Sequence, residues 1–84
     1  MSFNVYILKS LNVERFYIGS TSDMQKKLEM HNSFRAKWTK RYQPWTIVYT
    51  EEFATRSEAV KREKFLKSLK NIKRFLEGVT TLKN

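Results

Sequence analysis

Two tyrosines lie in short segments rich in β-branched and aromatic residues, which is the composition of paired strands. Tyr6 and Tyr17 each stand near the middle of such a segment, and a two-residue turn at Leu11-Asn12 would place them directly opposite each other. Gly19 follows Tyr17 by two residues, where glycine usually marks a bulge or a close approach of backbone or ligand. On the two tyrosines alone, cross-strand stabilisation of a hairpin is favoured over a reactive site.

A lysine and the chain's one histidine form a second candidate pair. Lys27 and His31 are four residues apart, so a helix would place both on one face. A single histidine is more often a structural residue than a catalytic one. On these residues alone, the structural interpretation is favoured.

Glu63 is the most unusual charge in the sequence. On a helical wheel it lies beside the apolar stripe of its segment, between Ala59 and Leu66. A carboxylate at the edge of a core must be paired, hydrogen-bonded or bound to a metal ion. An ion pair with Lys67 or Arg62 explains it, but a single carboxylate can also hold Mg²⁺, which keeps most of its waters.

The charge balance points to an anionic partner. Seventeen Lys and Arg residues stand against eight Asp and Glu residues, for a net charge of +9. Nucleic acid is the commonest partner of so basic a domain, followed by an acidic membrane surface or an acidic protein. There is no cysteine, which removes disulfides and thiolate chemistry. No segment is long and apolar enough for a signal peptide or a membrane helix, so we expect a cytoplasmic protein without membrane contact, taken as a monomer.

Two clusters of cations are candidates for nucleic-acid contact. In the first, basic residues alternate with aromatic ones, which suits phosphate contact combined with stacking. The second is a dense run between Lys61 and Arg74. The predicted nucleic-acid contacts are Arg35, Lys37, Trp38, Lys40 and Arg41 from the first cluster, and Lys64 and Lys67 from the second.

The 84 residues are enough for one domain, covering 1–84. Strands are predicted at Phe3–Leu8, Arg15–Ser20 and Trp45–Phe53 by their composition. Capping boxes that begin at Ser22 and at Thr55 predict helices to about Ser33 and over about Ser57–Lys70, the second with Phe65 on its apolar side. A last short helix is expected over 72–79, and Phe34–Gln43 is expected to be a loop. The order β-β-α-β-α-α predicts an α+β fold in which helices flank a three-stranded antiparallel sheet.

Taken together, these motifs resemble the GIY-YIG nuclease superfamily over about residues 3 to 77. Asn4-Val5-Tyr6 stands at the first motif, with its tyrosine kept and its glycine replaced, and Tyr17-Ile18-Gly19 matches the second motif in full. Ten residues separate the triplets, as in the family. The stretch S-E-A-V-K-R-E-K-F-L-K resembles the helix that carries the family's metal-binding glutamate. Small stand-alone bacterial GIY-YIG proteins are the most similar group.

The resemblance implies a divalent-metal endonuclease, with Mg²⁺ or Mn²⁺ as the metal ion. Family members include homing endonucleases, restriction enzymes and the incision subunit of bacterial DNA excision repair. Glu63 would be the metal ligand, Tyr6 or Tyr17 would activate or orient the attacking water, and His31 would assist proton transfer. The other tyrosine would position the phosphate.

One departure leaves alternatives open. The family's phosphate-binding arginine is Lys27 here, which keeps the charge but loses the bidentate fork. The main hypothesis is a metal-dependent endonuclease acting on nucleic acid, with DNA expected. The alternatives are a catalytically impaired nucleic-acid-binding module and a basic domain that binds protein or membrane. The nuclease hypothesis predicts that Tyr6, Tyr17, Lys27 and Glu63 line one concave basic surface. A Glu63 across the sheet from Tyr17 would contradict it.

Overall fold

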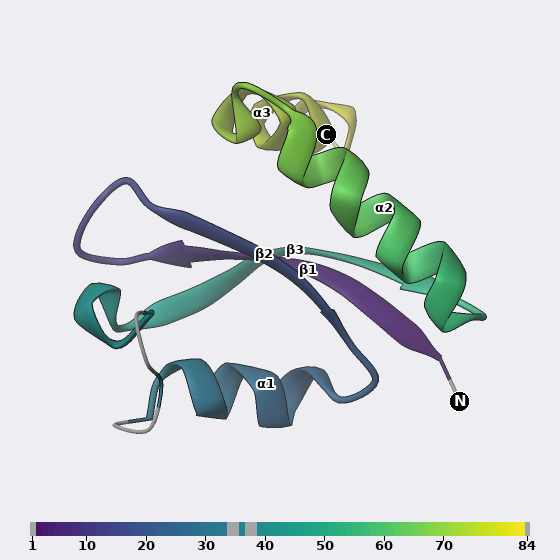
Figure 1. Ribbon diagram of the computed structural model, residues 1–84. Coiled ribbons are helices and arrows are strands. Elements are labelled where there is room, and N and C mark those ends of the chain that lie inside the picture. The colour runs from purple at the N-terminus through teal and green to yellow at the C-terminus, as the bar shows by residue number, and fades with distance from the viewer. Residues whose placement is uncertain (1, 34–35, 37–38, 84) are drawn as a thin grey trace.

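The computed structural model describes residues 2–33, 36 and 39–83. Its element order confirms the predicted β-β-α-β-α-α arrangement, and Figure 1 shows the sheet between helices on both sides. The elements are β1 (Phe3–Ser10), β2 (Phe16–Thr21), α1 (Met24–His31), the 3₁₀ turn η1 (Thr39–Tyr42), β3 (Trp45–Phe53), α2 (Arg56–Ser68) and α3 (Ile72–Lys83).

The sheet is antiparallel with strand order β2-β1-β3, so β1 is central and β2 is an edge strand. Helix α1 covers one face, and α2 with α3 covers the other (Figure 1). Four consecutive residues of β1, from Val5 to Leu8, are buried. A strand covered on both faces requires this continuous apolar run.

Side-chain alternation along β1 divides the core into two clusters. Val5 and Ile7 pack toward α2, where Leu66 is buried against them. Tyr6 and Leu8 pack toward α1. Tyr6 therefore projects from the α1 face of the central strand.

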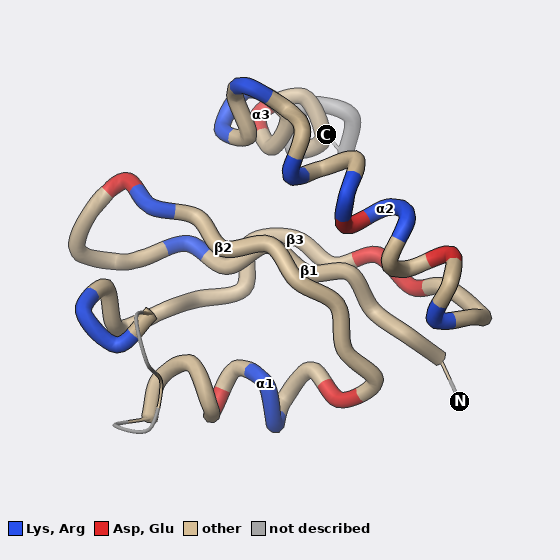
Figure 2. Tube along the Cα trace, viewed as in Figure 1, with Lys and Arg blue, Asp and Glu red and all other residues tan. Residues whose placement is uncertain are grey.

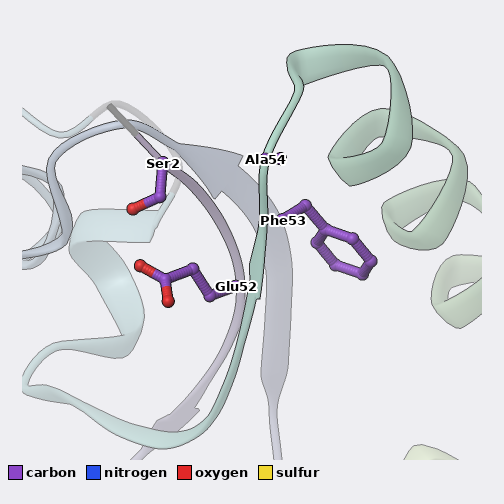
Figure 3. Close-up of a pocket in the computed structure, with 4 residues that line it drawn as sticks. All are labelled: Ser2, Glu52, Phe53 and Ala54. Atoms are coloured by element: carbon purple, nitrogen blue, oxygen red, sulfur yellow. The ribbon is translucent and has the colours of Figure 1, made fainter.

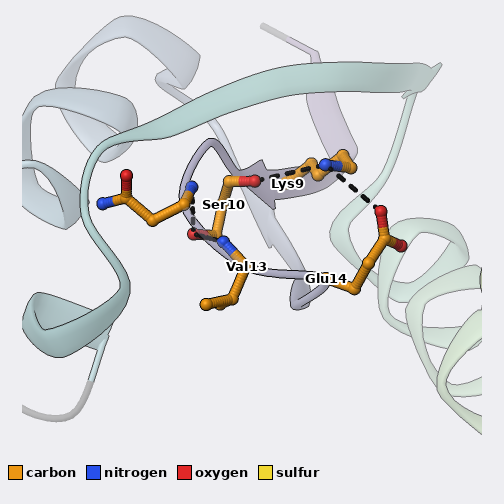
Figure 4. A network of polar contacts seen from close by, with 5 residues as sticks. Lys9, Ser10, Val13 and Glu14 are labelled. Carbon is orange, nitrogen blue, oxygen red and sulfur yellow. Dashed lines mark hydrogen bonds and ion pairs between the residues drawn. The ribbon is translucent and has the colours of Figure 1, made fainter.

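The β1–β2 hairpin differs from the predicted two-residue turn. Residues 11–15 connect the strands, and the Ser10 hydroxyl accepts hydrogen bonds from the backbone N–H groups of Asn12 (3.1 Å) and Val13 (3.2 Å), as Figure 4 shows. The longer connection shifts the register. Tyr6 lies opposite Gly19, so the prediction that the two tyrosines face each other directly is wrong.

The helix starts follow local capping chemistry. Asp23, rather than the predicted Ser22, caps α1, and its Oδ1 accepts from the backbone N–H of Lys26 at 3.1 Å. Both residue types are good caps, but Asp23 has the extended backbone that a cap needs. Thr55 caps α2 as predicted, accepting from the N–H of Glu58 at 3.2 Å.

Three further expectations change in detail. The segment predicted as a loop before β3 contains η1, α3 continues beyond 79 to Lys83, and Phe65 is 50% exposed instead of packing in the core. In the described part of the chain, no helix combines the length and the apolar character needed to cross a membrane.

Candidate active site

Gly19 makes room for the phenol of Tyr6. A Cβ atom placed on Gly19 would lie only 2.5 Å from Tyr6 Oη and 2.7 Å from Cζ. Gly19 has no positive φ, so the requirement for glycine is spatial rather than conformational. The sequence motif is thus explained by a close approach: the ring of Tyr6 crosses from the central strand to lie over the edge strand.

A chain of buried polar contacts holds this phenol. Tyr6 Oη lies 3.3 Å from His31 Nε2, and His31 Nδ1 lies 3.2 Å from Thr39 Oγ1. The indole N–H of Trp45 donates to the carbonyl of Thr39 at 2.8 Å. Tyr6 is 2% exposed and His31 is 3% exposed. His31 is therefore buried and has a partner at both ring nitrogens, one of which is the phenol of Tyr6.

Burial keeps both members of the pair neutral. It raises the pKa of Tyr6 above its ordinary value, with smaller contributions from Tyr17 and Glu63. Burial also lowers the pKa of His31, helped by the positive charge of Lys27. A neutral phenol that donates to Nε2 requires the imidazole proton on Nδ1, which then donates to Thr39. Nε2 is in that arrangement a proton acceptor.

Tyr17 lies beside this pair on the same face of the sheet. Its ring centroid is 6.2 Å from that of Tyr6 and 4.5 Å from that of His31. Tyr17 is half-buried, whereas Tyr6 is almost fully buried. The two tyrosine rings therefore pack together diagonally across β1 and β2, and Tyr17 is the more exposed of the two.

Glu63 is held by two partners. Ser20 donates its hydroxyl to Oε1 at 2.7 Å, and Lys67 Nζ forms an ion pair with Oε2 at 2.7 Å. Its side chain is 19% exposed. Burial alone would raise the pKa of Glu63, but the hydrogen bonds from Lys67 and Ser20 and the charge of Lys64 lower it below its usual value. Glu63 is a partly exposed carboxylate anion, and the ion pair predicted as its structural explanation is present.

The predicted single concave surface is not what the structure shows. Tyr6 and Tyr17 pack on the α1 face of the sheet, whereas Glu63 belongs to α2 on the opposite face. Strand alternation is the physical reason: Gly19 faces α1, and its neighbour Ser20 faces α2. The two halves of the site nevertheless meet at one place, because consecutive Cα atoms of β2 are about 3.8 Å apart. Glu63 thus lies across the sheet from Tyr17, which contradicts a nuclease site on one face and leaves only a site that wraps the edge of β2.

Lys27 lies near the start of α1, on the side of the tyrosines. It is half-buried and lines a surface hollow together with Thr21, Asp23 and Lys26. Its charge is close enough to lower the pKa of His31. Lys27 is therefore placed to attract an anion to the α1 side of the edge strand.

The predicted nucleic-acid contacts are only partly described. Lys40 and Arg41 are exposed on η1, and Lys64 is exposed on α2. Lys67 forms an ion pair with Glu63. Arg35, Lys37 and Trp38 lie outside the described residues.

A divalent metal ion fits this chemistry at Glu63. The carboxylate is ionised, partly exposed and adjacent to the Ser20 hydroxyl, so two oxygen donors of the kind that Mg²⁺ prefers lie together. The ammonium group of Lys67 occupies one carboxylate oxygen and would compete with the metal ion. No group of three or more His, Asp or Glu side chains forms a metal cage within residues 2–33, 36 and 39–83.

Ser20 and Thr39 are site residues that the sequence did not reveal. Ser20 is separated from Glu63 by 43 positions, and Thr39 from His31 by eight. Ser20 directly follows the Tyr17-Ile18-Gly19 triplet, which was a usable signal. No periodicity in the sequence marks Thr39.

The fold and these contacts define a small α+β domain with a tyrosine–histidine pair and a carboxylate at one edge strand. The family model described as the GIY-YIG catalytic domain matches residues 2–75, and the chain belongs to the GIY-YIG nuclease family.

Related proteins include chains of similar length. A UPF0213 protein of Staphylococcus saprophyticus is 38% identical over 78 residues, which cover 88% of this chain and 94% of that protein. A UPF0213 protein of Streptococcus pneumoniae is 41% identical over 56 residues, covering 66% of this chain and 57% of its own length. The solution NMR structure of a UPF0213 protein from Bacillus halodurans is 32% identical, with a TM-score of 0.56 over 99% of this chain and 86% of that one. These names state no activity or substrate.

Proposed function

We propose that this protein is a metal-dependent endonuclease that hydrolyses phosphodiester bonds in nucleic acid, with DNA as the substrate. The observation that carries the proposal is the junction at β2. There the phenol of Tyr6 lies over Gly19, and the next residue, Ser20, holds the carboxylate of Glu63. A phosphate at this free edge of the sheet would be within reach of groups from both faces.

The residues of the chain divide the chemistry between the two faces. Glu63 and Ser20 would hold the metal ion, which would polarise the phosphate and stabilise the leaving oxygen. Lys27 attracts the phosphate as a point charge from the α1 side. Tyr17, the more accessible tyrosine, orients the attacking water.

Tyr6 and His31 take up the proton of that water. A phenol of raised pKa is a poor base by itself, but it can accept the water proton while passing its own proton to His31 Nε2. His31 then carries a positive charge that burial and Lys27 both disfavour, so the proton returns from Nε2 through the hydroxyl of Tyr6 to the leaving oxygen. The bond from water oxygen to phosphorus forms as the ester bond breaks.

A second function has its own support. Lys27 replaces the family arginine, and Lys67 already neutralises Glu63. Both observations favour a nucleic-acid-binding module with impaired catalysis. The two functions share the binding surface and differ only in whether the bond is cut.

Nicking of a mixture of plasmid, flap and single-stranded DNA with Mg²⁺ or Mn²⁺ tests the proposal. The variants are Glu63→Gln, which keeps the shape of the side chain, and Lys27→Arg, with Glu52→Gln as an exposed carboxylate control. Metal-dependent cutting that Glu63→Gln abolishes and Glu52→Gln retains supports the nuclease. Cutting by Lys27→Arg alone, or binding without cutting in every variant, supports the impaired module.

A further inference from the structure

The two ends of the sheet carry different charged residues. At one end, β3 finishes with Glu51 and Glu52, and Glu58 lies in the first turn of α2. Glu52 also lines a hollow there with Ser2, and Figure 3 shows their oxygens on the same side of the strand. This end, called the acidic end below, carries Glu51, Glu52 and Glu58 and is the end from which β1 starts, but Arg62 pairs with Glu51 at 2.7 Å and Arg56 also lies there.

The opposite end of the sheet carries the β1–β2 turn and η1, which lie together in Figure 1. Arg15, Lys40 and Arg41 are exposed there, and they are called the basic end below. Glu14 also belongs to this turn, but Lys9 pairs with it at 3.6 Å. Figure 2 shows cations on the turn and η1 and acidic segments near the N-terminus, together with further cations along α1, α2 and α3.

Tyr42 organises two of these cations. The guanidinium carbon of Arg15 lies 5.0 Å from the centre of the Tyr42 ring, and that of Arg41 lies 5.9 Å from it. A guanidinium stacked on a ring loses rotational freedom but keeps its in-plane N–H donors directed away from the ring. That geometry suits bidentate contact with phosphate oxygens.

The basic end is held together by bonds between separate segments. The backbone N–H of Leu11 donates to the carbonyl of Pro44 at 3.0 Å, and the side-chain amide of Asn12 donates to the carbonyl of Gln43. The β1–β2 turn and the residues after η1 therefore form one preorganised surface, which lowers the entropy that binding must overcome.

A row of aromatic rings connects this surface to the site. The ring centroids of Tyr42 and Trp45 are 6.3 Å apart, those of Trp45 and Tyr17 are 6.5 Å apart, and Tyr17 adjoins Tyr6 at 6.2 Å. Along β2, the three steps from Gly19 to Phe16 span about 10 Å. A nucleic-acid backbone that passes the site can reach the basic end within a few nucleotides.

We propose that nucleic acid extends from the site toward the basic end, where Arg15, Lys40 and Arg41 hold its phosphates around Tyr42. The acidic end, where Arg56 and Arg62 balance all but one of the three carboxylate charges, attracts it less. Arg15 is thus a nucleic-acid-binding residue contributed by the hairpin, and it sets the direction in which the substrate lies. The position of the cut relative to this contact rests on the proposed function, whereas binding at the basic end does not.

The chain offers a matched control in Arg56. Its guanidinium carbon lies 5.2 Å from the centre of the Phe3 ring, so it is also stacked on an aromatic ring, but at the acidic end. Arg15→Gln and Arg56→Gln each remove one positive charge that is stacked on an aromatic ring. Binding to a DNA duplex of about two helical turns is followed by fluorescence anisotropy without metal, between 50 and 200 mM salt.

Arg15→Gln is expected to lower the slope of log affinity against log salt by about 1. The fold loss of DNA affinity between 50 and 200 mM salt should then be roughly 3.5 times smaller for Arg15→Gln than for the wild type, because one phosphate contact is missing. Arg56→Gln is expected to keep the wild-type slope. In NMR spectra, the Nε–H signal of Arg15 should shift when DNA is added, and that of Arg56 should not.

Equal slopes for the two variants, or a shift of Arg56 without Arg15, would overturn the proposal. Nicking assays on the same proteins separate this outcome from failure of the proposed function. A wild type that cuts through Glu63, while Arg15→Gln binds like Arg56→Gln, overturns only the direction of binding. An altered slope for Arg15→Gln in a protein that never cuts supports the binding surface and rejects the nuclease.

Discussion

Replacing Gly19 by alanine would drive a methyl group into the phenol of Tyr6. The added Cβ would lie 2.5 Å from Oη, 2.7 Å from Cζ and 3.1 Å from Cε2. The ring has little room to withdraw, because Tyr6 is buried and its hydroxyl is bonded to His31. The substitution therefore perturbs the site from the opposite strand without removing any functional group.

The expected cost is the difference between two effects. Overpacking a buried position costs about 1–3 kcal/mol of unfolding free energy. Alanine also stabilises by about 0.4–1 kcal/mol, since it restricts the unfolded chain. The difference is a net loss of up to about 2.6 kcal/mol, and its midpoint of about 1.3 kcal/mol corresponds to a fall in Tm of about 5–10 °C for a domain of this size.

Gly78→Ala is the matched control, because no atom lies within 4 Å of a Cβ added at Gly78 on α3. That variant should gain about 0.5–1 kcal/mol, as expected for removing a glycine from a helix. Urea unfolding followed by circular dichroism measures both changes. In a protein that already carries Tyr6→Leu, the ring atoms are absent. Gly19→Ala should therefore lower the unfolding free energy of that protein much less.

The reasoning would be refuted if Gly19→Ala were as stable as Gly78→Ala. It would also be refuted if the cost of Gly19→Ala were unchanged in the Tyr6→Leu background, since the two positions would then be energetically independent. Either result would mean that the family glycine is kept for a reason other than the space occupied by the Tyr6 ring.

Two further predictions concern the charges around the site. Since the folded pKa of His31 is lowered, the unfolded chain binds more protons below about pH 6.5, and stability should fall as the pH drops through that value, by at most about 1.4 kcal/mol per pH unit. His31→Gln should flatten this dependence in urea titrations between about pH 5 and 7, and parallel curves for both proteins would contradict it. Lys67→Met should raise the affinity for Mn²⁺ by roughly 2- to 5-fold, because the ion pair with Glu63 no longer competes. Electron paramagnetic resonance of free Mn²⁺ measures this, and Lys64→Met, which affects Glu63 through charge alone, should change it less; equal effects would argue against direct competition.

Local rules predicted most of the fold. The strands, the Thr55 cap and the element order depend on neighbours within a few residues, and each was readable from composition and spacing. The hairpin register was not, because it depends on how the Ser10 hydroxyl bonds the turn. A shift of two residues retained the face of Tyr17 but moved it from opposite Tyr6 to opposite Leu8.

The residues of the candidate site were named from the sequence, but their contacts were not. Spacing placed Lys27 and His31 on one helix face, yet nothing in it could pair His31 with Thr39. A helical wheel placed Glu63 beside the core without indicating which face of the sheet that core covers. Contacts between distant segments depend on tertiary packing, and periodicity carries no information about them.

The position of the site at an edge strand resolves two opposing electrostatic demands. Burial raises the pKa of Tyr6 and lowers that of His31, which favours the neutral forms, whereas hydrogen bonds from Lys67 and Ser20 lower the pKa of Glu63 despite its partial burial. One cavity cannot supply both environments to groups in contact. A strand with a different helix on each face can, because consecutive residues alternate between the faces. Gly19 thus lies against the buried Tyr6 on the α1 face, and Ser20 contacts the partly exposed Glu63 on the α2 face. The neutral pair on one face and the carboxylate anion on the other thus occupy different environments while their anchoring backbones stay adjacent.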